Sequence, residues 1–115
     1  MKYMIMLFER DTDWGSVPEE ALDEALAEHG RFTTMLRERG IDYYGEAVKD
    51  SREAVTLRPS GDGLAASDGP FAQQEAQLSG FYVVDVKDLD EAVEIARQCP
   101  TAAGTEVRPI WESAA

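Results

Sequence analysis

The stretch YMIMLF, residues 3–8, is apolar at every position. Successive side chains of a strand point to opposite faces of a sheet, so the odd-numbered residues share one face and the even-numbered residues share the other. The run GFYVVDV, residues 80–86, is likewise apolar on both faces. A half-covered antiparallel sheet normally alternates apolar and polar residues. These two runs therefore predict central strands of a sheet that is covered on both sides.

The first helix is predicted from the signals at its two ends. Ser16 and Glu19 have the spacing of a capping box, and Gly40 stands where a glycine commonly ends a helix. Together they predict a helix over about residues 17–39.

Further strands and a second helix are predicted downstream, with Asp88 as the helix N-cap and Pro100 after its end. The expected strands are residues 41–48, 54–60, 64–67, 80–86 and 105–111, and the expected helix is residues 89–98. We expect the segments around the turn GDG to add one hairpin strand to a ferredoxin-like split βαβ pair, in the order β-α-β-β-β-α-β or βαβ(ββ)αβ. The fold class is α+β with an antiparallel sheet, in a single domain over residues 1–115.

Two helices cover only one face of such a sheet. Leaving several apolar side chains of the other face in water forgoes roughly 1.5–3 kcal/mol each. The simplest cover is a second copy of the same sheet, which predicts a homodimer through the open sheet face. The alternative cover is the loop around Trp14 or the C-terminal segment.

The composition limits the classes of partner. With 23 acidic and 11 basic residues the net charge is −12, which offers no basic footprint for nucleic acid. The single cysteine, Cys99, forms no disulfide within the chain, and the first apolar run is too short for a signal or membrane segment. We expect a cytoplasmic protein without direct nucleic-acid or membrane contact. One histidine with scattered carboxylates has no metal-ligand spacing, so neither a metal nor an organic cofactor is expected.

His29 is the only histidine and lies within the first predicted helix. At helical spacing it shares a stripe with Leu22, Ala25, Leu26, Phe32, Thr33 and Leu36. This stripe is expected to face the core, where an imidazole needs a hydrogen-bond partner. The neighbouring Gly30 suggests that something packs closely against the helix. His29 is either a satisfied core residue or the base of a site.

The segment SDGPFA, residues 67–72, supplies the second candidate group. Gly69 and Pro70 indicate a turn, Phe71 is expected to be a ring tucked under the loop, and Asp68 is the candidate acid. The residues predicted to support the pocket or loop are Gly69, Pro70, Phe71, Phe81, Tyr82 and Tyr43.

Six segments, MKYMIMLFERD, FTTMLRERG, SDGPFA, QLSGFYVVDV, ARQCP and VRPIW, resemble in order and spacing the YCII-related proteins of the DGPF type, from Met1 to Trp111. The resemblance implies a ferredoxin-like dimeric α+β barrel. It also implies an active-site pair of a first-helix histidine and a loop aspartate, which map to His29 and Asp68. Some relatives of this type occur beside extracytoplasmic-function sigma factors, so the resemblance implies an association of that kind too. The run Gln73–Ala76 departs from the pattern.

These observations predict a small-molecule-binding protein that acts as an acid–base enzyme of isomerase, lyase or dehalogenase type. A carboxylate on one imidazole nitrogen leaves the other nitrogen to move a proton, with His29 as base and Asp68 as its orienting partner. Haem ligation by His29 is disfavoured. The alternatives are a non-catalytic ligand sensor and an accessory or regulatory protein linked to a sigma factor.

Overall fold

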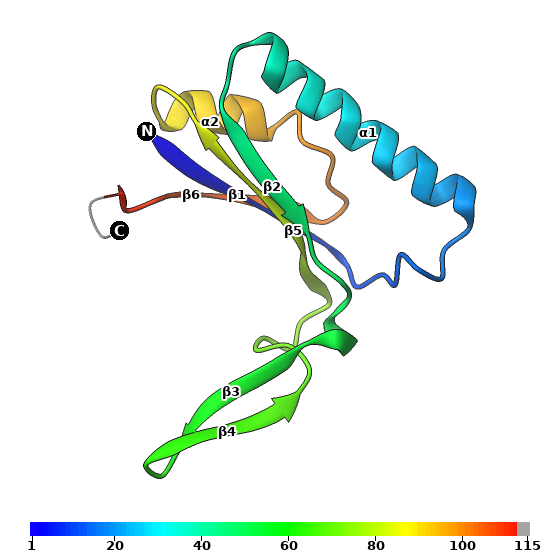
Figure 1. Ribbon diagram of the computed structural model, residues 1–115, viewed down its shortest axis with the longest axis vertical. Coiled ribbons are helices and arrows are strands. Elements are labelled where there is room, and N and C mark those ends of the chain that lie inside the picture. The colour runs from blue at the N-terminus through cyan, green and yellow to red at the C-terminus, as the bar shows by residue number, and fades with distance from the viewer. Residues whose placement is uncertain (113–115) are drawn as a thin grey trace.

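The computed structural model describes residues 1–112 and has two helices on one side of a four-stranded sheet (Figure 1). The main sheet contains β1 (Lys2–Arg10), β2 (Tyr43–Ala47), β5 (Ala76–Asp85) and β6 (Gly104–Pro109). The helices are α1 (Glu19–Glu38) and α2 (Leu89–Ala96). Strand order is β2-β5-β1-β6, every neighbouring pair is antiparallel, and the ferredoxin-like α+β prediction is confirmed. Neither helix combines the length and apolar character needed to cross a bilayer.

The two hairpin segments around the turn GDG do not join this sheet. The prediction that they add one strand to the ferredoxin-like order is therefore wrong. β3 (Val55–Ser60) and β4 (Gly63–Asp68) form a two-stranded sheet of their own, preceded by a short 3-10 turn at Ser51–Glu53. Residues 1–112 therefore form six strands, and β3 and β4 project away from the body as an arm, on the side opposite the helices (Figure 1). We call these two strands the β3–β4 arm.

The core lies between the helices and the face of the sheet formed by the odd-numbered residues of β1. Tyr3, Ile5 and Leu7 are buried there, as predicted from the alternation. The other buried apolar residues come from α1, β5, α2 and the segments after them: Phe32, Leu36, Val84, Val86, Ala92, Ile95, Ala96 and Cys99. One face of YMIMLF thus supplies the centre of the only core cluster found in residues 1–112.

The C-terminus of α1 closes with the glycine that the sequence predicted. Gly40 has φ of 69°, in the left-handed region that favours glycine. Its N–H donates to Arg37 O at 3.0 Å, and the Ile41 N–H donates to Leu36 O at 2.9 Å. This is a Schellman motif, which satisfies helix carbonyls and turns Ile41 back onto the core.

The predicted capping box at the N-terminus of α1 is wrong. Pro18 is the N-cap and no side chain caps the helix. Ser16 instead donates its hydroxyl to Asp13 Oδ2 at 2.7 Å, within the preceding turn. The corresponding prediction for α2 is confirmed, because Asp88 Oδ1 accepts from the Glu91 N–H at 3.0 Å.

Only the second half of α1 packs on the sheet. Phe32 and Leu36 are buried, whereas Leu26 is 61% exposed although it belongs to the stripe predicted to face the core. No atom lies within 4 Å of the Cβ position at Gly30, so the predicted close packing there is wrong as well. The apolar stripe continues beyond the sheet, and His29 lies where the helix leaves it.

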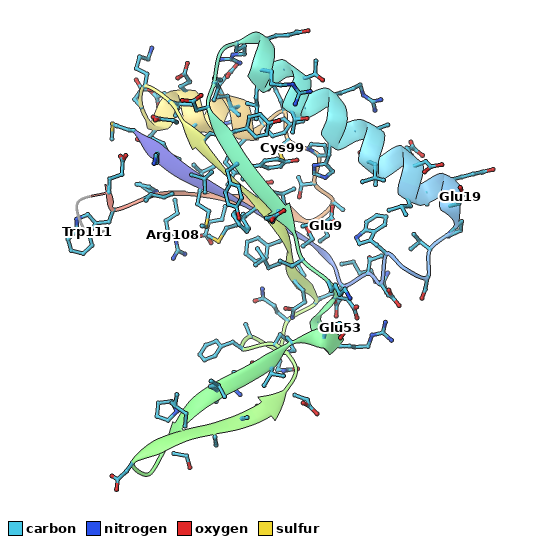
Figure 2. The ribbon with its side chains drawn as sticks, viewed as in Figure 1. Glu9, Glu19, Glu53, Cys99, Arg108 and Trp111 are labelled. Atoms are coloured by element: carbon cyan, nitrogen blue, oxygen red, sulfur yellow. The ribbon has the colours of Figure 1, made fainter. Side chains whose placement is uncertain are left out.

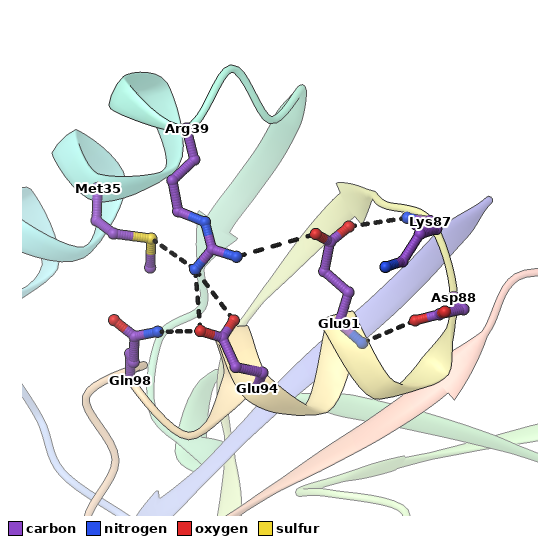
Figure 3. Close-up of polar contacts among 7 residues, drawn as sticks. All are labelled: Met35, Arg39, Lys87, Asp88, Glu91, Glu94 and Gln98. Carbon is purple, nitrogen blue, oxygen red and sulfur yellow. Dashed lines mark hydrogen bonds and ion pairs between the residues drawn. The ribbon is translucent and has the colours of Figure 1, made fainter.

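Arg39 joins the end of α1 to α2 (Figure 3). Its Nη1 donates to both carboxylate oxygens of Glu94 at 3.1 and 3.0 Å, and its Nη2 lies 3.9 Å from Glu91 Oε2. Gln98 donates to the same Glu94 carboxylate at 3.1 Å. One guanidinium nitrogen is thus shared by both carboxylate oxygens, and an ion pair of this kind adds little stability at an exposed site. It holds the packed half of α1 in register with α2.

The opposite face of the main sheet carries no helix. The apolar side chains that strand parity and pairing place there are Met4, Met6, Phe8, Tyr44, Leu78, Phe81 and Val83. We call this set the open sheet face. Arg108, opposite Met4 in β6, lies on the same side of the sheet (Figure 2). β1 is therefore apolar on both faces, as the sequence predicted, and the helices of residues 1–112 cover only one of them.

The packing difference along α1 is testable with two identical substitutions. Leu36 is fully buried, so Leu36→Ala should lower the free energy of unfolding by about 2–5 kcal/mol. Leu26→Ala removes the same atoms from a side chain that is 61% exposed and should change it by less than about 1 kcal/mol. Urea denaturation measures both, and equal losses would contradict the asymmetric packing.

Candidate functional site

The only histidine is hydrogen-bonded to a tyrosine on the helix-facing side of the sheet. His29 Nδ1 lies 2.8 Å from the hydroxyl of Tyr82, and both side chains are partly buried. Their rings stack at 28° with centroids 6.0 Å apart. A bond of this length fixes the orientation of the imidazole and leaves Nε2 as the nitrogen without this partner.

Two neighbours hold the Tyr82 ring in place. Phe32 packs against it edge-on, with centroids 5.0 Å apart. Gly45 lies opposite Tyr82 in the β2–β5 pairing, and a Cβ there would come within 2.5 Å of Tyr82 Cδ1. A glycine inside a strand often marks such a close approach, so Gly45 is the sequence signal for the position of the Tyr82 ring.

A second tyrosine widens the cluster towards β2. The Tyr43 ring lies 6.5 Å from that of Tyr82, and Arg37 Nη1 donates to its hydroxyl at 2.7 Å. Tyr43 and Tyr82, both predicted to line a pocket, thus lie near each other, and Tyr82 contacts His29. We refer to His29, Phe32, Tyr43 and Tyr82 as the histidine–tyrosine cluster.

The Tyr82 phenol is held neutral. Burial, with smaller effects from Cys99 and Tyr43, raises the pKa of Tyr82 from 10.0 to about 12. A neutral phenol both donates and accepts, so it accommodates either tautomer of the ring. When Nδ1–H donates to the phenol oxygen, Nε2 carries the lone pair of a base; when the phenol donates, Nε2 carries the proton.

Cys99 is a core residue and not a nucleophile. It lies between the helices and the sheet (Figure 2), and burial raises the pKa of its thiol from 9.0 to about 12. The thiolate is the reactive form of cysteine, and this environment suppresses it. Within residues 1–112 there is also no group of three or more histidine, cysteine, aspartate and glutamate side chains placed to hold a metal ion.

The structure does not bring Asp68 to His29 within one chain. Asp68 ends β4, opposite Val55, and its side chain is exposed. Among residues 1–112 no hydrogen bond joins it to His29, whose nitrogen is bonded to Tyr82 instead. The catalytic roles assigned to the two residues stay predictions.

The turn after Asp68 is only partly as predicted. Gly69 has φ of 105°, as a turn glycine should, and its carbonyl accepts from Thr56 Oγ1 at 2.7 Å. Pro70 follows it, half-buried. Phe71 is 74% exposed, with the Arg58 guanidinium 5.1 Å from its ring centroid, so the prediction of a tucked ring is wrong.

Phe81 lies away from the histidine. It shares the open sheet face with Tyr44, whose ring centroid is 5.7 Å away. Its predicted pocket role is therefore not supported on the helix side, where its neighbour Tyr82 lies.

A hollow of about 400 Å³ lies beside the histidine–tyrosine cluster, between α1 and the segment that follows α2. It is lined by Glu28, Arg31, Phe32, Met35, Gln98 and Pro100. Phe32 belongs to both the hollow and the cluster. The volume falls within the range of small-molecule sites, about 300–1,000 Å³.

Two buried groups predict how stability depends on alkaline pH. The pKa values of Tyr82 and Cys99 are raised on folding to about 12. The stability that the two neutral groups contribute to the folded state is therefore fully present below pH about 9 and is lost as pH rises towards about 12. The free energy of unfolding should fall over this window, and Cys99→Ala should delay the fall towards pH about 10. Tyr44→Phe, which removes a phenol that is 57% exposed, is the control and should leave the profile unchanged.

The close approach of Gly45 to Tyr82 predicts a local effect of one methyl group. Gly45→Ala should displace the Tyr82 ring and change the ring-nitrogen NMR resonances of His29, which are unambiguous because the chain has one histidine. Gly63→Ala adds the same methyl group where no atom lies within 4 Å, and should leave them unchanged. Identical spectra for Gly45→Ala and the unsubstituted protein would contradict the described contact.

Comparison with known proteins supports the resemblance to the YCII-related proteins. The family model described as the YCII-related domain matches residues 1–114. A curated relative, an uncharacterised protein of Rhizobium meliloti (strain 1021), is 44% identical over 61 residues, which are 50% of this chain and 49% of the relative. That match spans about half the length of the relative. The family model covers nearly the whole chain, and the protein belongs to the YCII-related domain family.

Proposed function

We propose that the protein binds a small molecule beside the histidine–tyrosine cluster and that His29 moves a proton of that ligand. The 2.8 Å contact between His29 Nδ1 and the Tyr82 hydroxyl carries this proposal. It uses one ring nitrogen for positioning and leaves Nε2 for a ligand. A partly buried imidazole held in this way is suited to general acid–base chemistry.

The chemistry needs neither a metal nor a redox partner. His29 Nε2 takes a proton from a carbon next to a carbonyl group, and the electron pair of that C–H bond passes towards the carbonyl oxygen. Returning the proton to another carbon completes an isomerisation. Loss of a leaving group from the neighbouring carbon completes an elimination. Tyr82 acts as a positioning residue, because it contacts the imidazole rather than the ligand.

The hollow indicates the class of ligand. Phe32, Met35 and Pro100 offer an apolar wall, and Arg31 lies in the same lining. An apolar body with one carboxylate or lactone group matches this combination, because a guanidinium binds carboxylates through paired hydrogen bonds. Glu28 in the same lining disfavours a second anionic group close to it.

Asp68 keeps a role in the proposal only when a ligand or a second protomer brings it to the site. The homodimer through the open sheet face belongs to the same proposal, and it is supported by the seven apolar side chains that share that face without a covering helix. Within one chain, Tyr82 takes the orienting position that the sequence had assigned to Asp68.

A regulatory role without catalysis is the second candidate. The net charge of −12 favours it, because an acidic surface suits contact with a basic protein such as a sigma factor. In that case the hollow serves as a sensor site. Binding without chemistry distinguishes this candidate from the first.

The proposal predicts deuterium exchange that depends on His29. Small oxo acids and lactones are the probes, and a member that binds should raise the melting temperature of the unsubstituted protein. In D₂O the protein should catalyse exchange of the carbon-bound protons of that compound, measured by NMR. His29→Gln should lower the exchange rate at least about a hundredfold, the usual scale of general-base catalysis.

Leu26→Ala, on the exposed part of the same helix, is the control and should retain the rate. Exchange that survives His29→Gln would rule out His29 as the base. A raised melting temperature without exchange would favour the sensor.

A further inference from the structure

The β3–β4 arm has one apolar and one polar face. Strand pairing places Val55, Leu57, Pro59, Leu64 and Ala66 on one side, and Thr56, Arg58, Ser60, Ala65 and Ser67 on the other. We call the first set the apolar arm face. Its largest side chains are open to solvent, with Val55 63%, Leu57 55% and Leu64 63% exposed.

An arm of this kind is incomplete by itself. A two-stranded hairpin is at best marginally stable alone in water. Thr56 is the only buried residue of the two strands, and its hydroxyl bond to Gly69 O anchors the base rather than the tip. The three exposed aliphatic side chains each forgo about 1.5–3 kcal/mol of burial. Packing against another surface would recover part of this.

The dimensions of the chain show how much surface lies uncovered. Its accessible area is 7981 Å², whereas a compact monomer of 12.7 kDa exposes about 6,200 Å². Its radius of gyration is 16.1 Å, against about 13 Å for a compact chain of this length. The excess area of about 1,700 Å² exceeds the roughly 800 Å² that each partner contributes to a standard protein interface.

The chain itself carries the complementary surface. The open sheet face is apolar and uncovered, and the arm extends on that side of the sheet (Figure 1). A twofold dimer contact is self-complementary, so the arm of each protomer meets the sheet of the other. Charge does not decide the contact, because Arg108 on the open sheet face is already paired with Glu106.

We propose that the apolar arm face packs onto the open sheet face of a second copy of this chain, so that two protomers exchange arms across a twofold axis. This goes beyond a dimer made by the sheets alone, because it gives the arm a binding function. It places Leu57 and Leu64 in the interface, and it moves Asp68 from solvent to the boundary between protomers.

Two neighbouring alanines give a matched test. Ala66→Asp adds a carboxylate to the apolar arm face, and Ala65→Asp adds the same group to the polar face, opposite Arg58. Burying an unpaired charge is costly, so Ala66→Asp should raise the dimer dissociation constant at least about tenfold. Ala65→Asp should change it by less than about twofold. Sedimentation equilibrium measures the constant, and circular dichroism checks that both variants are folded.

Met6→Asp on the open sheet face separates this proposal from a dimer of sheets alone. Arm exchange predicts that Met6→Asp and Ala66→Asp both weaken the dimer. A dimer weakened by Met6→Asp but indifferent to Ala66→Asp overturns the role of the arm and leaves the sheet contact standing. A monomer at every concentration overturns both. Hydrogen exchange gives a second readout: the arm amides should be protected in the dimer and lose protection when dilution dissociates it.

Discussion

The structure depends on a strand that is apolar on both faces, while residues 1–112 supply helices for only one of them. β1 lies at the centre of the sheet, and its buried side chains Tyr3, Ile5 and Leu7 organise the core beneath α1 and α2. Its other side chains lie on the open sheet face, which no element of residues 1–112 covers. A sheet of this kind can be held together by one layer of helices, which leaves its second face for the proposed contact with a second copy of the chain. The proposed arm exchange would cover this face and part of the excess area.

The same alternation creates the candidate site. In β5, neighbouring aromatic residues point to opposite sides, so Phe81 lies with the open sheet face while Tyr82 turns to the helices. Tyr82 meets His29 at the point where α1 leaves the sheet, which explains why the imidazole is only half-buried. The missing side chain at Gly45 provides the room for the ring. The site thus needs a strand, a helix and a glycine from three separate segments.

Local patterns in the sequence predicted the elements well because hydrophobic period and terminal signals are short-range. The Schellman end of α1 at Gly40 and the Asp88 cap of α2 are examples. Long-range relations were predicted less well. The pattern around Asp68 indicated a turn, but nothing in it indicated that the hairpin leaves the main sheet, and that departure separates Asp68 from His29 within the chain. The partner of His29 could not be read from spacing either, because it lies 53 residues away across the packed layers.

The identity of that partner changes the chemistry expected of the imidazole. A carboxylate such as Asp68 would fix the ring and would also stabilise the imidazolium that forms when the ring takes a proton. The Tyr82 phenol fixes the ring but stays neutral, because burial raises its pKa to about 12. It therefore contributes orientation without the charge that favours protonation. A base supported in this way is suited to carbon acids that a neighbouring carbonyl already activates.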